Sequence, residues 1–149
     1  MIEGEKMKKI AIISDTHDVL RDEVIKELNT CDLIFHAGDF VKEEIYQQLQ
    51  KIAPIIAVKG NNDKFDLPEE LNCEIAGHKF YLTHQKKDVQ NVDFYIFGHS
   101  HRYLEQKIDN TYYLNPGSCG RKRFSLPLTY MILYIDKNNY YVVRREIKR

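Results

Sequence analysis

The stretch Lys9–Ser14 reads KIAIIS, and Asp15-Thr16-His17 follows it directly. It is a short, nearly continuous run of β-branched and other apolar residues, which is typical of a strand buried on both faces. Two similar runs come later, DLIFH at Asp32–His36 and PIIAV at Pro54–Val58. We therefore predict three buried strands in the first part of the chain.

The segments between these strands have helical spacing. Apolar residues recur three or four positions apart over Val19–Leu28 and again over Val41–Ile52. The order β-α-β-α-β predicts a parallel sheet with right-handed crossovers.

The second half of the chain reads mainly as strands. They are expected at Asn72–Ala76 and Lys79–Thr83, joined by a turn at Gly77-His78, and then at Val92–Phe97, Tyr112–Leu114, Leu128–Ile135 and Tyr140–Arg145. Only the segment between Gln85 and Asn91 has room for another helix. The pattern favours an α/β protein in which a parallel half meets a more antiparallel half.

Length and composition predict a single domain over residues 1–149, with residues 1–7 as a flexible extension, because the first apolar pattern begins just after Met7. Hydrophobic residues make up 43% and charged residues 30%, as in ordinary globular proteins. Lys and Arg number 22, as do Asp and Glu, so the net charge is zero. This balance excludes a protein dedicated to coating polyanions.

The chain contains no apolar run of the roughly 18–20 residues that cross a bilayer, and Met1–Lys9 does not resemble a signal peptide. Its cysteines, Cys31, Cys73 and Cys119, lie too far apart for a metal knuckle or a disulfide framework. We expect a reduced, cytoplasmic protein without membrane contact. A homodimer is left open.

Polar side chains follow each of five predicted strands. They are Asp15, His17, Asp39, Asn61, His84, His99 and His101. Ligands of open α/β sheets bind beyond the carboxyl ends of the strands. Carboxylates, imidazoles and an amide without cysteine suit divalent Mn, Fe, Co, Ni or Zn. The residues therefore predict a transition-metal site.

Seven candidate ligands exceed the needs of one ion and fit two ions about 3.5–4 Å apart that share a carboxylate, an arrangement that clamps a phosphoryl group. In Asp15-X-His17 and His99-X-His101, an extended chain would point both side chains the same way. Gly38, Gly60 and Gly98 allow close backbone approach before a ligand. Each motif alone is common in turns and helix caps, but their conjunction at five strand ends favours a site. His36 and His78 are assigned structural roles, within a strand and a turn.

The ordered set Asp-X-His, Gly-Asp, Gly-Asn-Asn-Asp, His and Gly-His-X-His resembles the calcineurin-like metallophosphoesterases. Ile13–His17, Leu82–His84 and Asn115–Ser118 are similar to the small YfcE-type phosphodiesterase branch. The resemblance implies a four-layer α-β-β-α sandwich of two mixed sheets with two metal ions. It matches Asp15, His17 and His101 to one ion and Asn61, His84 and His99 to the other, with Asp39 bridging.

Two departures from the family pattern bear on catalysis and fold. Asn62 stands where larger members often carry a histidine, and the stretch from His84 to His99 is short, which removes a helix. We expect Asn62 to donate a hydrogen bond to a phosphate oxygen and Asp63 to orient a histidine ligand. Asn115–Ser118 is expected to support the wall of the site.

These features predict a phosphodiesterase that hydrolyses a small phosphate ester with a metal-activated water. One alternative is a non-catalytic protein-interaction scaffold of the same fold, like the small retromer subunit. A nuclease is another alternative, although the chain has no tryptophan and no basic cluster larger than Arg121-Lys122-Arg123. Nucleic acid is therefore not an expected partner.

Overall fold

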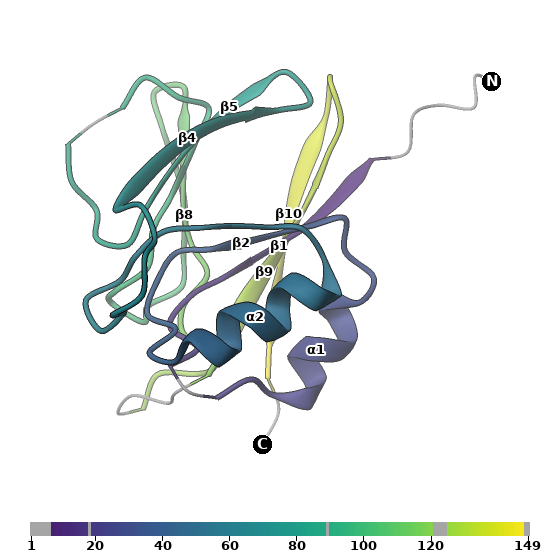
Figure 1. Ribbon diagram of the computed structural model, residues 1–149. Helices are drawn as coiled ribbons and strands as arrows, with labels where there is room; N and C mark the ends of the chain where they lie inside the picture. Colours follow the sequence, from purple (N-terminus) through teal and green to yellow (C-terminus); the bar gives the residue numbers. More distant parts are fainter. Residues whose placement is uncertain (1–6, 18, 89, 121–124, 148–149) are drawn as a thin grey trace.

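The computed structural model describes residues 7–17, 19–88, 90–120 and 125–147. Of the expected N-terminal extension only Met7 falls within these ranges, and Arg121-Lys122-Arg123 lies outside them. The described residues form two five-stranded sheets and two helices (Figure 1). The elements are β1 (Lys8–Ile13), α1 (Asp22–Leu28), β2 (Leu33–His36), α2 (Glu43–Ile52), β3 (Ile55–Ala57), β4 (Glu70–Ile75), β5 (His78–Thr83), β6 (Phe94–Ile96), β7 (Leu104–Ile108), β8 (Thr111–Asn115), β9 (Thr129–Ile135) and β10 (Tyr140–Glu146).

The first sheet has the order β10-β9-β1-β2-β3. Its strands β1, β2 and β3 are parallel, as predicted from the apolar runs. The C-terminal strands β9 and β10 join this sheet in antiparallel pairs, with Ile12 opposite Met131. Helices α1 and α2 lie together on the side of this sheet that faces away from the second sheet (Figure 1).

The second sheet has the order β4-β5-β6-β8-β7 and is mixed, with the antiparallel pairs β4–β5 and β7–β8 at its edges. Its central strands β5, β6 and β8 are parallel, because the connections between them return the chain to the same end of the sheet. The β4–β5 hairpin turns at Ala76 and Gly77, whose φ angles are 52° and 81°. His78 is therefore the first residue of β5 and not a turn residue as predicted.

Sequence patterns missed one strand and placed two helix starts too early. Strand β7 reads LEQKI, and most of its side chains are exposed at a sheet edge, so no apolar alternation marks it. Helix α1 begins at Asp22 rather than Val19. Helix α2 begins at Glu43 because Val41 has a φ of 70°, which is incompatible with a right-handed helix.

The two sheets pack face to face through a shared apolar core. Ile10, Ile12 and Phe35 of the first sheet lie in one buried cluster with Phe80 and Phe94 of the second. This arrangement confirms the predicted α/β sandwich of two mixed sheets. No helix among the described residues is long and apolar enough to span a membrane.

The outer face of the second sheet is covered by a connecting segment, and none of the described residues there forms a helix. Tyr81, Tyr95 and Tyr113 are buried on this face. The Lys87 amide donates to the Tyr95 hydroxyl at 2.9 Å, and the Lys86 ammonium lies 4.6 Å from the centre of the Tyr113 ring. The described residues therefore do not form the second helical layer of the expected four-layer α-β-β-α sandwich, and the short connection between β5 and β6 lies in its place.

Candidate metal centre

The loops that follow strands of both sheets meet at one edge of the sandwich. The Asp15 amide after β1 donates to the Gly38 carbonyl after β2 at 3.0 Å. The His99 amide after β6 donates to Oδ2 of Asp15 at 3.2 Å. The carboxyl ends of strands from different sheets therefore contribute to a common site, as the sequence predicted.

Buried carboxylates and imidazoles face one another at this edge. Nε2 of His84 lies 3.6 Å from Oδ2 of Asp39 and 4.0 Å from Oδ1 of Asp15. Nε2 of His101 lies 3.5 Å from the same Oδ1 of Asp15. Asp15 has no exposed surface, and Asp39 and His84 are each 4% exposed.

The structure brings all seven candidate ligands into one neighbourhood. Asp15, His17 and His101 place potential ligand atoms within 4.8 Å of one another, and so do Asp15, Asp39 and His84. The rings of His84 and His99 are 5.2 Å apart, and Asn61 lines a cleft together with His84. Asp15 belongs to both groups, whereas the family resemblance assigned it to one ion.

The tautomer of His84 follows from its hydrogen bond. Nδ1 lies 2.7 Å from the Ala37 carbonyl oxygen, so this nitrogen carries the proton. Burial lowers the pKa of His84, which favours the neutral ring. Nε2 therefore directs a lone pair at two carboxylates, an arrangement that is repulsive unless a cation lies between them.

Asp15 points to the same requirement. Its Oδ1 and Nε2 of His84 are buried and have no hydrogen-bond partner among the described residues, which is uncommon for buried polar atoms. Burial raises the pKa of Asp15 to about 7, and the hydrogen bond from Ser14 at 2.7 Å opposes this shift. The donor set thus fits divalent cations in both charge and chemistry.

The backbone at the site adopts an uncommon conformation. Asp15, His17, Asp39, His99 and His101 all have φ angles between 54° and 74°. This left-handed conformation costs a non-glycine residue roughly 1 kcal/mol or more, and such residues cluster at functional sites. The prediction that an extended chain aligns each Asp-X-His or His-X-His pair was wrong, because the strands have already ended.

Two glycines permit the close packing of the loops. A Cβ atom on Gly60 would lie 2.2 Å from the Asp39 amide nitrogen, and one on Gly98 would lie 2.0 Å from Ser14 Oγ. Both distances are far below van der Waals contact, so a side chain at position 60 would clash with the backbone of Asp39, and one at position 98 would require Ser14 to move.

Comparison with known proteins identifies the family. Residues 7–138 match the model of the calcineurin-like phosphoesterase superfamily domain. The chain belongs to this superfamily. It is 31% identical to the phosphodiesterase MJ0936 of Methanocaldococcus jannaschii over 89% of this chain and 96% of that protein.

Two solved structures show a similar fold. The Escherichia coli phosphoesterase Yfce superposes with a TM-score of 0.71 at 18% identity and covers 94% of this chain and 100% of its own. Vps29 of Entamoeba histolytica, solved in complex with Zn²⁺, gives a TM-score of 0.75 at 22% identity and covers 93% and 98%. The predicted resemblance to small calcineurin-like phosphoesterases is confirmed.

Asp63 connects the loop after β2 to the loop after β3 through hydrogen bonds that the sequence did not indicate. Its carboxylate accepts hydrogen bonds from the backbone amides of Asp39, Phe40, Val41 and Gly60 at 2.7–2.9 Å. The expectation that Asp63 orients a histidine ligand was wrong, because the Ala37 carbonyl holds His84 and these amides occupy Asp63.

Asn62 and Asn115 both donate hydrogen bonds to residues of the loops that form the site. The Asn62 amide and side chain donate to the two oxygens of Asp39 at 2.9 and 3.2 Å. Asn115 donates to the Gly98 carbonyl at 3.1 Å, and Ser118 donates to the Asp15 carbonyl at 3.1 Å. The segment Asn115–Ser118 therefore supports the site wall, as predicted.

His36 links two loops that carry candidate ligands. Its Nδ1 accepts from the Gly38 amide at 3.0 Å, so Nε2 carries the proton and donates to Thr16 Oγ1 at 3.0 Å. The ring is fully buried and stacks on Phe40 with 3.5 Å between ring centres, and burial holds its pKa well below the usual value. The position of His36 within a predicted strand did not indicate that it would connect these two loops.

Replacing His36 with leucine should loosen both loops. The change leaves the Gly38 amide and the Thr16 hydroxyl without their partner, which should lower the free energy of unfolding by about 2 kcal/mol or more. Hydrogen exchange should speed up at residues 14–17 and 38–41. Denaturation and exchange measurements check this, with His78→Leu as control, since His78 binds the distant Asp136 carbonyl. Unchanged exchange at both loops in His36→Leu would contradict the assigned role.

Proposed function

We propose that this chain is a phosphodiesterase that uses two divalent transition-metal ions, Mn²⁺, Ni²⁺, Fe²⁺, Co²⁺ or Zn²⁺, to hydrolyse a small phosphate ester. The observation that carries the proposal is the lone pair of His84 directed at the buried carboxylates of Asp15 and Asp39. When bound, two such ions supply Lewis-acid charge and acidify water, which is the chemistry that phosphate-ester hydrolysis needs near neutral pH.

The ligands divide between the two positions as the family resemblance implies. Asp15, His17 and His101 would hold one ion, and the short distances among their ligand atoms support this. Asn61, His84 and His99 would hold the other ion. Asp39 is proposed as the shared ligand, supported by its 3.6 Å approach to His84 and by the hydrogen bond from the His17 amide to its carbonyl.

Asn62 is the side chain best placed to meet the substrate. It is exposed, and its amide group already donates to Asp39 at the rim of the site. By rotating outward it can donate to a phosphate oxygen instead. It cannot donate a proton to a leaving group, because a carboxamide has no pKa near neutrality. Asp63 is unsuited to that task as well, since it is buried and bound by backbone amides.

A scaffold without catalysis is the alternative reading, and the fold alone does not exclude it. The details of the site favour the enzyme. A docking surface has no need of buried carboxylates facing an imidazole lone pair, because an uncompensated buried charge is costly. Metal content and turnover of an aryl phosphodiester, measured on the same preparation, separate the two functions. The nuclease alternative stays untested, since its basic cluster lies outside the described residues.

Asp39→Asn should lower kcat/KM for an aryl phosphodiester by at least ~100-fold, because a neutral amide cannot hold two cations together against their repulsion. The fold should persist, since Asp39 lies at the sheet edge and not in the apolar core. Circular dichroism and metal analysis accompany the kinetics.

Asp15→Asn is the matched comparison, because Asp15 also faces both groups of ligand atoms. If Asp39 is the bridge, Asp15→Asn should weaken only one ion, whereas Asp39→Asn should weaken both. An Asp39→Asn protein that retains two ions and normal turnover would refute the bridging assignment.

The value of kcat/KM should depend steeply on the pKa of the leaving group. Because neither Asn62 nor Asp63 is suited to donate a proton, we expect an alkoxide or phenoxide to depart without a proton from either of them. We expect kcat/KM to fall as the leaving-group pKa rises across a graded series of aryl phosphodiesters. Asn62→His should flatten this dependence. A flat series for the native protein would show that another group donates the proton.

A further inference from the structure

A cleft opens beside the proposed metal centre. It has a volume of about 320 Å³ and is lined by residues that include Asn61 and His84 as well as Lys59, Glu69, Gln85 and Lys87. His84 presents Nε2 to the carboxylates and is held at Nδ1 by the Ala37 carbonyl, so its ring forms the boundary between the cleft and the site. A phosphate ester at the site has room to extend one substituent into this cleft.

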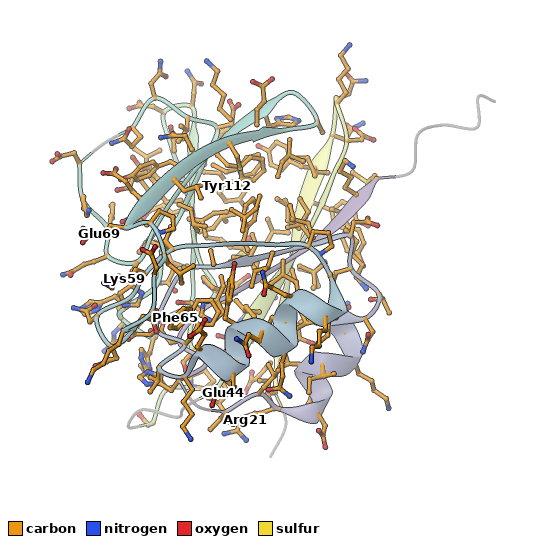
Figure 2. All side chains as sticks on the ribbon, viewed as in Figure 1. Arg21, Glu44, Lys59, Phe65, Glu69 and Tyr112 are labelled. Carbon is orange, nitrogen blue, oxygen red and sulfur yellow. The ribbon has the colours of Figure 1, made fainter. Side chains whose placement is uncertain are left out.

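The cleft offers positive charge to that substituent. Lys59 and Lys87 both line it, and within the described residues neither makes an ion pair with a carboxylate. Glu69 is the acidic residue of the lining. It lies on the same side of the molecule as Lys59 (Figure 2). Two ammonium groups that form no ion pair with a carboxylate of the described residues favour an anionic group over a neutral one.

Hydrogen bonds from their backbone amides hold the main chain of both lysines at the cleft. The Lys59 amide donates to the Pro68 carbonyl at 2.8 Å, directly after the buried Val58. The Lys87 amide donates to the Tyr95 hydroxyl, which in turn donates to the Asp88 carbonyl at 3.0 Å. The neighbouring Lys86 instead places its ammonium over Tyr113 and does not line the cleft.

We propose that the cleft binds a second phosphoryl group of the substrate, with Lys59 and Lys87 as its cationic partners. The inference rests on the proposed function and narrows it to phosphate esters that carry a further phosphate. The carboxylate of Glu69 repels a bound phosphate and so limits how much negative charge the cleft accepts. The two lysines determine specificity and take no part in bond cleavage.

Two p-nitrophenyl diesters of one nucleoside test the inference. They share a leaving group, and one carries a free ribose hydroxyl where the other carries a phosphate. The native protein should prefer the phosphorylated diester by about tenfold or more in kcat/KM. Added salt should reduce this preference, because it screens the exposed ammonium groups.

Variants identify the groups responsible. Lys59→Met and Lys87→Met keep the aliphatic stem and should each remove most of the preference, while kcat/KM for the diester with the free hydroxyl stays near the native value. Glu69→Gln should raise the preference. Lys86→Met is the matched control and should leave it unchanged. Equal loss in Lys86→Met and Lys87→Met would overturn the assignment to the cleft.

The outcomes separate this inference from the proposed function. Hydrolysis of both diesters without preference would overturn the inference and leave the phosphodiesterase standing. Absence of all hydrolysis would refute the proposed function, and calorimetry then tests the cleft by itself. A nucleoside bisphosphate should bind the metal-loaded protein more tightly than the monophosphate, and Lys87→Met should abolish the difference. Equal dissociation constants in the native protein would refute the inference whatever the activity.

Discussion

Where the loops meet, negative charge is buried opposite an imidazole lone pair, and the surrounding residues hold these groups together. Asp15 and Asp39 are both buried, and the neutral tautomer of His84 directs Nε2 at them. Desolvation opposes such an arrangement unless positive charge compensates it. Burial raises the pKa of Asp15 to about 7, because removing the carboxylate from water disfavours its charged form. Without a bound cation, the buried charges at such a site are expected to be energetically unfavourable.

The surrounding loops hold these groups in place against that cost. Asp63 accepts four backbone amide hydrogen bonds, and His36 joins the loop after β1 to the loop after β2. The left-handed backbone at five of the candidate ligands adds conformational strain. The loops also touch closely at Gly60, where an added Cβ atom would lie 2.2 Å from the Asp39 amide nitrogen. A preorganised site of this type keeps its ligands near binding geometry before any ion arrives.

The sequence indicated which residues lie at this edge of the sheets, but it did not indicate how all the strands pair. Parallel strands place their carboxyl ends at one edge, so a polar residue after each apolar run indicates where that residue lies. An apolar run does not indicate in the same way which strand it pairs with in the sheet. Nothing in Thr129–Ile135 indicates that it pairs with β1 instead of with its chain neighbours in the second sheet. The roles of Asp63 and His36 could not be predicted from the sequence. Their hydrogen-bond partners are backbone amides and the Thr16 hydroxyl, and no sequence motif identifies such partners.

We propose that this edge of the sandwich holds two metal ions per chain. Calorimetric titration of the metal-free protein with Mn²⁺ tests it most directly, with elemental analysis of the loaded protein as a check. The account predicts two equivalents for the native chain and close to one retained equivalent in each of His17→Ala and His99→Ala, which belong to different proposed ions. Binding of a single ion by the native chain, or two full equivalents in both variants, would contradict it.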